Sequence, residues 1–145
     1  MSLSEGAMTS PAPFAIELRV YYQQTDAAGV VYHSNYLGFM EAARTEYLRS
    51  LGIDLVVLAD EDAAMFVVHR ADVRFRRPAR LDDLVRVTAR VTQAGRARVQ
   101  FLQTVLRGDE CLIEAEVELA CVHRHEWRPI ALPRRVRAAL ENDPR

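Results

Sequence analysis

The chain has 145 residues, of which 50% are hydrophobic and 27% are charged, an ordinary balance for one globular domain. Its 19 Lys and Arg residues against 20 Asp and Glu residues give a net charge of −1, so no overall field favours nucleic acid or an anionic membrane. No apolar run approaches the length of a membrane span, and the first residues lack the basic start and apolar segment of a signal peptide.

The chain begins with a stretch that predicts a flexible tail, because residues 1–13 contain two prolines and many small residues. We therefore expect a single domain over residues 14–145. Apolar and polar side chains alternate from Phe14 to Tyr22, the period of a half-buried strand, and this pattern places the Tyr22 ring on the apolar face. Residues 23–32 contain small residues around Gly29 and are expected to form a turn and loop.

A long helix follows the loop. Its expected start is Ser34 or Asn35, either of which is a good N-cap, and Gly52 supplies a stop. Glu41 and Arg44 lie off the apolar side at helical spacing, which predicts a structural ion pair. The apolar stripe comprises Tyr36, Leu37, Met40, Ala43, Tyr47, Leu48 and Leu51.

After a mixed, acidic connection over residues 53–63, with room for a short second helix, four strand patterns follow one another. They cover residues 65–76, 84–92, 97–105 and 111–121, and Pro133 then opens a short C-terminal helix. The first of these strands is expected to place Val67, His69, Ala71, Val73 and Phe75 on one face. One strand, one long helix and a four-stranded meander predict an α+β fold in which the helix lies across the apolar face of an antiparallel sheet.

The two cysteines, Cys111 and Cys121, fall in the same strand pattern. Ten residues of extended strand separate them by roughly 33 Å, which is beyond the reach of a disulfide. Unpaired thiols fit a reducing compartment, so we expect the protein in the cytoplasm.

Tyr22, Asp26 and His33 are polar side chains grouped between the first strand and the long helix. A turn that leads into a helix start collects unpaired backbone N–H groups and the positive end of the helix dipole. A carboxylate there can attack a carbonyl or activate water while the N–H groups polarise the carbonyl oxygen. Three alternatives remain open at this point: Asp26 as a turn former, His33 as a surface residue near the helix cap, and Tyr22 as a core residue.

Other catalytic patterns are weaker. His123 and His125 share one strand face, but no third ligand is spaced to complete a metal site, so no metal or cofactor is expected. The sequence has no G-x-S-x-G motif, which forms the nucleophile turn of α/β-hydrolase serine enzymes. Glu41 is the reserve candidate for a catalytic base.

The run VYYQQTDAAGVVYHSNYLGFMEAARTEYL resembles the signature of hotdog-fold acyl-CoA thioesterases, in particular the YbgC-type bacterial enzymes and the 4-hydroxybenzoyl-CoA thioesterases. The stretches FVVHRADVRFRRPARLDDLVRV, IEAEVELACV and RPIALPRRV are similar to the same group, so the likeness covers about residues 16–140. It implies a hotdog fold, in which a five-stranded antiparallel sheet wraps around one long central helix.

The resemblance also implies an activity, the hydrolysis of short-chain or aromatic acyl-CoA, and a homodimer or homotetramer with sites at subunit interfaces. Asp26 is then the catalytic carboxylate, with Tyr22 and His33 beside it, and backbone N–H groups near His33 hold the thioester oxygen. The substrate is expected to be acyl-CoA, with acyl carrier protein as the other possible carrier. The expected substrate contacts are Val31, Tyr32, His69, and, for the phosphates, Arg96 and Arg98, whose alternative role is a solvated strand face.

Two other functions stay open. A hydratase or dehydratase on the same fold would use Glu41 and His69 as its acid and base. A non-catalytic module would bind acyl chains without turnover. The set of Tyr22, Asp26 and His33 favours hydrolysis, because a pure binder has no need of a carboxylate facing a thioester.

Overall fold

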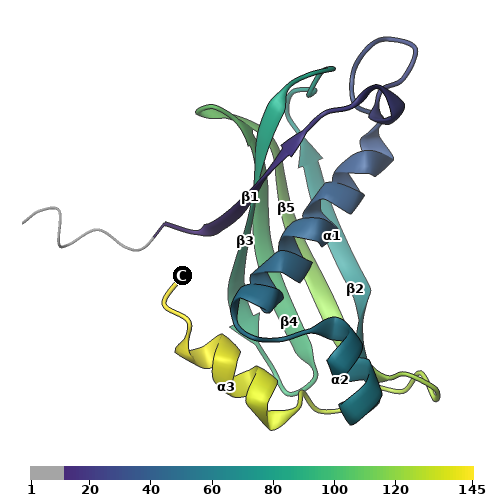
Figure 1. Cartoon of the computed structure of the whole chain (residues 1–145), viewed down its shortest axis with the longest axis vertical. Helices are drawn as coiled ribbons and strands as arrows, with labels where there is room; N and C mark the ends of the chain where they lie inside the picture. The colour runs from purple at the N-terminus through teal and green to yellow at the C-terminus, as the bar shows by residue number, and fades with distance from the viewer. Residues whose placement is uncertain (1–11) are drawn as a thin grey trace, which may run out of the picture.

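The computed structural model describes residues 12–145, so nearly all of the tail predicted over residues 1–13 lies outside the described residues. Figure 1 shows the course of the chain. The strands are β1 (Phe14–Arg19), β2 (Ala64–Phe75), β3 (Leu84–Ala94), β4 (Arg98–Arg107) and β5 (Glu110–His123). The helices are α1 (His33–Ser50), α2 (Leu55–Asp62) and α3 (Arg134–Asn142), together with a short 3₁₀ turn, η2 (Tyr22–Gln24).

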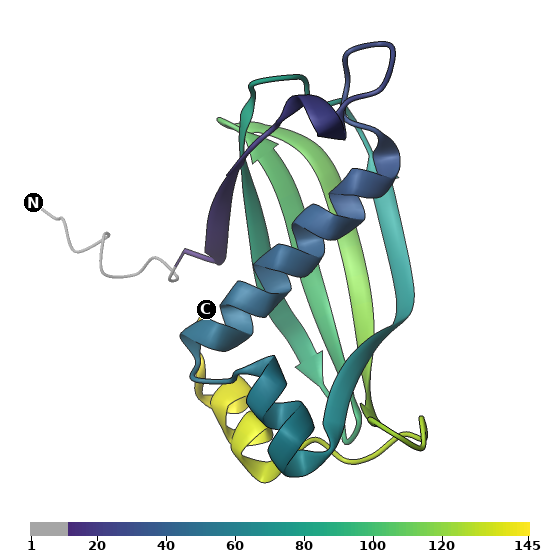
Figure 2. The ribbon, with the colours of Figure 1, turned by 45° about the vertical axis from the view of Figure 1, so that its right-hand side comes forward.

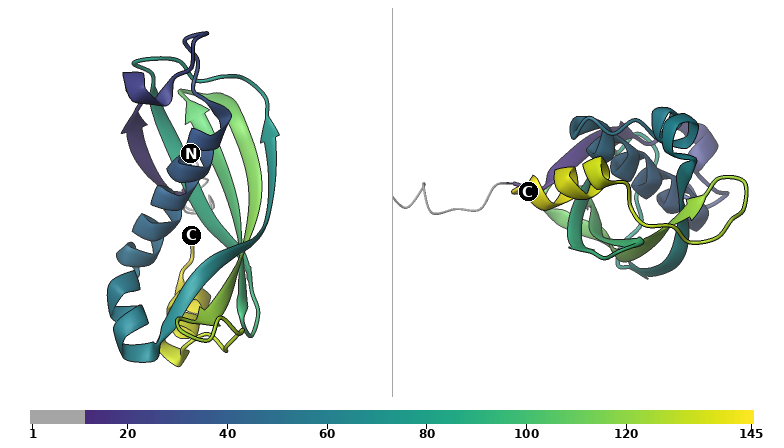
Figure 3. Two further views of the ribbon diagram at one scale, coloured as in Figure 1. Left: turned by 90° about the vertical axis from the view of Figure 1, so that its right-hand side faces the viewer. Right: turned by 90° about the horizontal axis from the view of Figure 1, so that it is seen from below.

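The five strands form one antiparallel sheet in the order β1-β3-β4-β5-β2. The sheet curves around α1, which crosses it diagonally (Figure 2). We call the side that faces α1 the concave face and the other side the convex face. Figure 3 shows α2 and α3 at the end of the sheet opposite η2. The predicted α+β class, with a five-stranded antiparallel sheet around one long helix, is confirmed.

The core lies between α1 and the concave face. Tyr36, Met40, Ala43, Tyr47 and Leu48 of the predicted stripe are buried, and each large side chain among them stabilises the fold by about 1.5–3 kcal/mol. Two members of the stripe are not buried: Leu37 is 49% exposed, and Leu51 is half-buried. Within the described residues, no helix combines the length and the apolar character needed to cross a membrane.

The start of α1 differs from the expectation. The helix begins at His33, its N-cap residue is Tyr32, and no side chain caps it. The predicted cap at Ser34 or Asn35 is therefore wrong. Asn35 instead ties the helix to the preceding loop, since its side-chain amide donates to the Gln24 carbonyl at 2.9 Å.

Arg44 is the second departure. It was expected to pair with Glu41 at the surface, but it is only 8% exposed, and no ion pair between these two occurs within residues 12–145. Its guanidinium donates to Gln103 Oε1 at 3.0 Å, and Gln103 Nε2 donates at 3.0 Å to the carbonyls of Met40 and Thr88. Burial lowers the pKa of Arg44, while the charge of Glu41 opposes that shift. The network joins α1 to β3 and β4.

The third departure concerns β2, whose pairing with β5 shifts register between Val68 and Arg70. Such a bulge places two residues opposite one on the neighbouring strand. Consequently Ala71 and later alternate residues face α1 as predicted, but Val67 and His69 do not. His69 Nε2 lies 3.7 Å from Glu118 Oε1, on the convex face.

Candidate active site

The loop between β1 and α1 folds back on itself. The N–H of Asp26 donates to the Val30 carbonyl at 2.9 Å, and the N–H of Tyr32 donates to the Gln24 carbonyl at 3.0 Å. These bonds hold Asp26 close to the residues that begin α1.

A second set of contacts fixes the loop to the connection between β2 and β3. The N–H of Val31 donates to the Ala79 carbonyl at 2.9 Å, and the N–H of Ala79 donates to the Tyr36 hydroxyl at 2.8 Å. Burial raises the pKa of the Tyr36 hydroxyl, and the bond from Ala79 opposes this. Val31, predicted to contact substrate, is itself 5% exposed and belongs mainly to the core.

The exposed carboxylate of Asp26 uses one oxygen to shape the loop. Oδ1 accepts from the N–H of Ala28 at 2.8 Å and, at 3.4 Å, from the N–H of Val30. Oδ2 has no hydrogen bond to any residue in 12–145. The turn-forming interpretation is thus correct for one oxygen, and the other remains available for chemistry.

The start of α1, into which this loop leads, offers unpaired donors. Among residues 12–145, the N–H of Asn35 donates to the Tyr32 carbonyl at 2.9 Å, whereas the N–H groups of His33 and Ser34 have no acceptor. These N–H groups, at the positive end of the helix dipole, can bind an anionic oxygen. The side chain of His33 is exposed and its ring lies over that of Tyr32, with centroids 4.4 Å apart.

An aromatic pocket adjoins the helix start. It has a volume of about 280 Å³ and is lined by Val31, His33, Tyr36, Phe75, Arg76, Arg77 and Pro78. The ring of Phe75 meets His33 and Tyr36 edge-on, at centroid distances of 6.4 and 5.9 Å. His33, whose N–H group is unpaired, is one of the residues that line this pocket.

Tyr22 does not point into the fold. The strand β1 ends at Arg19, Val20 takes the buried position, and η2 then turns the chain, which leaves Tyr22 80% exposed. The prediction of an inward ring is wrong because the strand alternation stops three residues earlier than the pattern suggested. Tyr32, the N-cap residue of α1, is also exposed.

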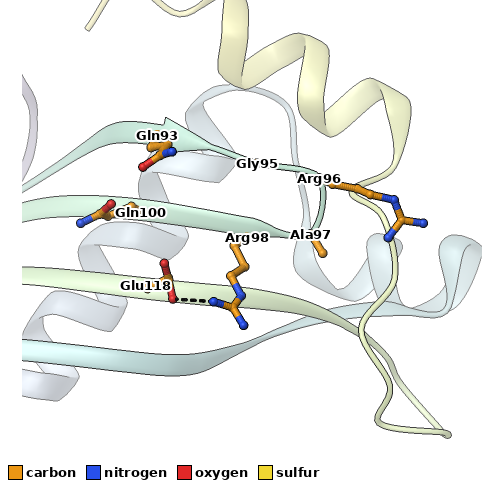
Figure 4. Close-up of a pocket in the computed structure, with 7 residues that line it drawn as sticks. All are labelled: Gln93, Gly95, Arg96, Ala97, Arg98, Gln100 and Glu118. Carbon is orange, nitrogen blue, oxygen red and sulfur yellow. Dashed lines mark hydrogen bonds and ion pairs between the residues drawn. The ribbon is translucent and has the colours of Figure 1, made fainter.

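The predicted phosphate ligands lie elsewhere. Arg98 contacts Glu118 at 3.4 Å, and Figure 4 shows Arg96 and Arg98 pointing in different directions around a pocket of about 330 Å³. Their hairpin joins β3 to β4 at the end of the sheet near α2 and α3 (Figure 1), whereas the Asp26 loop is at the other end. The 11 residues of β3 make that separation roughly 35 Å. One chain therefore does not bring Arg96, Arg98 or His69 to Asp26.

Gln103 is the structural residue that the sequence reasoning passed over. It lies at an inward position of β4 between Phe101 and Val105, and it is fully buried. A polar side chain in an otherwise apolar alternation was the available signal. His123, considered as a metal ligand, organises its turn instead, because its Nδ1 accepts from the N–H groups of His125 and Glu126 at 3.2 and 3.1 Å. No cluster of three or more candidate ligands occurs in the described part of the chain.

Comparison with known proteins shows which family this chain resembles in sequence and in fold. The sequence model of the Thioesterase superfamily matches residues 28–114. Acyl-CoA thioesterase YbgC of Haemophilus influenzae is 41% identical over 129 residues, which cover 89% of this chain and 95% of that protein. A 1,4-dihydroxy-2-naphthoyl-CoA hydrolase of Thermosynechococcus vestitus is 30% identical over 127 residues, covering 86% of each. A solved probable thioesterase from Bartonella henselae superposes with a TM-score of 0.81 at 37% identity, covering 84% of this chain and 100% of that one.

Proposed function

The chain belongs to the Thioesterase superfamily, and we propose that this hotdog-fold acyl-CoA thioesterase cleaves its substrate at the Asp26 loop. The observation that carries the assignment of the site is the pairing of two features. Among the described residues, a carboxylate with one unengaged oxygen lies in the loop that leads into a helix start with two unengaged N–H groups.

The chemistry needs an oxygen nucleophile and a stabilised oxyanion, because a thiolate is already a good leaving group. Asp26 Oδ2 either attacks the thioester carbon or takes a proton from an attacking water. The N–H groups of His33 and Ser34, with the dipole of α1, stabilise the negative charge on the carbonyl oxygen. The C–S bond then breaks, coenzyme A leaves as the thiolate, and water supplies the oxygen of the free acid.

The aromatic pocket supports a short-chain or aromatic acyl group. Tyr36 and Phe75 provide two ring walls, and edge-to-face contacts with a third ring are favourable. Purified protein assayed with acyl-CoAs from acetyl to palmitoyl, and with benzoyl-CoA, tests this through release of free thiol. The same acyl groups on acyl carrier protein test the carrier. Faster turnover of palmitoyl-CoA than of benzoyl-CoA would contradict the proposed acyl class.

We also infer that two chains pair through their β2 edges. Among the described residues, β2 pairs only with β5. Its inward residues Val68 and Phe75 are each 54% exposed, and Leu37 on α1 is 49% exposed. Antiparallel pairing of two β2 strands would bring the partner's β3–β4 hairpin toward the end that carries the Asp26 loop. Such a dimer offers a way for Arg96 and Arg98 to serve the neighbouring site.

The hydratase alternative finds no support in these positions. It requires Glu41 and His69 to act together, but Glu41 is exposed on α1 and His69 lies on the convex face against Glu118. A cytoplasmic location is supported by the free thiols of Cys111 and Cys121. Burial, and then the charge of Asp62, raise the pKa of the Cys121 thiol to about 11, so it stays protonated and unreactive.

A further inference from the structure

The connection between β2 and β3, residues 76–83, crosses the ends of β5 and β4, because these two strands lie between β2 and β3 in the sheet. Its first part is held by β5, since the N–H groups of Arg76 and Arg77 donate to the Leu112 carbonyl at 2.9 and 3.2 Å. We call the residues that follow, 78–80, the support segment.

The support segment contacts the Asp26 loop through its backbone. Ala79 is fully buried, and its carbonyl accepts from the N–H of Val31 at 2.9 Å. Arg80 forms an isolated antiparallel bridge with Val30. Both contacted residues stand between Asp26 and the first residue of α1. The position of the support segment therefore affects the position of the carboxylate relative to the unpaired N–H groups of the helix.

The support segment is itself held by Arg107, the last residue of β4. Arg107 Nη1 donates to the Pro78 carbonyl at 3.3 Å and to Asp83 Oδ2 at 2.7 Å. The same carboxylate oxygen accepts from the N–H of Arg80 at 2.8 Å. One guanidinium thus contacts the segment directly at its first residue and, through Asp83, at its last.

The guanidinium of Arg107 is fixed by a third partner. Its Nη2 donates to Glu110 Oε1 at 2.7 Å, and the side chain is 30% exposed. A guanidinium presents its donors in one rigid plane, so three acceptors around it are held at set relative positions. Arg107 is not among the residues that line the aromatic pocket, and its hydrogen bonds go to residues other than Asp26. Any effect on the reaction must pass through the support segment.

We propose that Arg107 is a positioning residue for thioester hydrolysis, which sets the place of the Asp26 loop against the start of α1 through the support segment. The inference rests on the proposed site at Asp26. That site requires the carboxylate and the helix N–H groups to act on one thioester group at the same time. A small displacement of the loop separates the two and slows the reaction without removing either of them.

Arg107→Gln tests the proposal, because glutamine cannot hold all three acceptors. We expect kcat for acyl-CoA to fall by at least about tenfold with KM close to that of the parent, since a misplacement on the order of 1 Å can cost about 100-fold. The amide hydrogens of Val31 and Ala79 should also exchange faster with solvent, because their hydrogen bonds join the support segment to the loop and to α1. Hydrogen exchange followed by NMR measures this without reference to activity.

Arg145→Gln is the matched control. The Arg145 side chain is 27% exposed, and it also contacts a carboxylate, that of Asp143, at 3.0 Å, together with the Ser50 hydroxyl at 3.0 Å. Ser50 is the last of the 18 residues of α1, which places this contact roughly 27 Å from the helix start. Arg145→Gln should lower the melting temperature about as much as Arg107→Gln does, but keep the parent kcat and the parent exchange of the two amides.

Arg107→Lys is the second variant, and it decides the matter if Arg107→Gln does not fold. It keeps the charge but not the planar set of donors, so kcat should fall in the same direction by a smaller factor. A parent-like kcat in the folded variant would overturn the proposal. An equal loss of kcat in Arg145→Gln would also overturn it, since a general loss of stability would then explain both results. Parent activity in Asp26→Asn would refute the proposed site instead, and the exchange of the two amides would still show whether Arg107 holds the loop.

Discussion

At the scale of single residues, we propose that Asp26 performs two tasks with its two oxygens. Oδ1 holds the turn by accepting from the N–H of Ala28, and Oδ2 would act on the substrate or on a water. An asparagine can keep the first task, because its amide oxygen still accepts that bond, but it cannot serve as nucleophile or base. This division makes the carboxylate testable without disturbing the loop.

Asp26→Asn should lower kcat by at least about 100-fold, the low end for a positioned acid–base group, while thermal stability and acyl-CoA binding change little. Steady-state assays with thiol detection, together with a melting curve, measure both. His33→Ala should be milder, because the backbone N–H of residue 33 survives the change.

Asp109→Asn is a matched control for that experiment, since Asp109 is an exposed turn carboxylate between β4 and β5. It should leave kcat unchanged. An Asp26→Asn enzyme that keeps more than about half of the parent kcat would exclude the carboxylate mechanism, because a lost acid–base group costs about 100-fold or more, and Glu41 would be the next residue to change.

The phosphate assignment of Arg96 and Arg98 also belongs to this scale. Replacing both with alanine should raise the KM for acyl-CoA but not for a short pantetheine thioester, which lacks the nucleotide phosphates. Loss of one charged hydrogen bond weakens binding by about 1.5–3 kcal/mol, and solvent exposure of Arg98 makes the lower value the better expectation. Equal changes in KM for the two substrates would show that these arginines are structural or solvated.

At the scale of elements, the position of α1 on the sheet depends on a buried polar contact as well as on apolar packing. Gln103 accepts from Arg44 and donates to carbonyls of α1 and β3. An apolar interface alone tolerates sliding and rotation of a helix, whereas these directional bonds specify one placement. Because these bonds fix the position of α1, they also fix the position of its first residues and of their unpaired N–H groups.

Gln103→Leu should reduce the free energy of unfolding by about 1–3 kcal/mol or more, because it leaves a buried guanidinium without its acceptor. Urea denaturation measures the loss. Arg44→Leu combined with Gln103→Leu should be less destabilising than the sum of the single changes, since both partners are then removed together. Strict additivity of the two changes would mean that the contact contributes nothing as a pair.

At the scale of the whole molecule, the edge strand β2 is incompletely covered on its inward side. The helix α1 shields β1, β3 and β4 more than β2, so apolar side chains that point inward from β2 still meet water. A long edge strand of this kind invites pairing with another chain unless it is charged or interrupted. The proposed β2 dimer would cover it.

Val68→Arg should therefore dissociate the edge dimer and lower activity together, because it places a charge on the inward side of β2. Small-angle scattering and the thiol assay on the same samples measure the two effects. Leu84→Arg is the control, a comparably exposed apolar residue at the start of β3. A stable, fully active monomer would refute the edge pairing.

The sequence by itself determined the kinds and order of the elements, because periods of 2 and 3.6 are local properties of each stretch. It also placed Asp26 near His33, since seven residues of tight loop cannot separate them far. Tertiary structure decided the side-chain directions and the long-range contacts that those local patterns do not determine. The early end of β1 turned Tyr22 outward, a bulge carried His69 to the convex face, and the partner Gln103 allowed Arg44 to be buried. The length of β3 put Arg96 and Arg98 far from Asp26. Each of these depends on strand register and on contacts between residues distant in the chain, which no local period encodes.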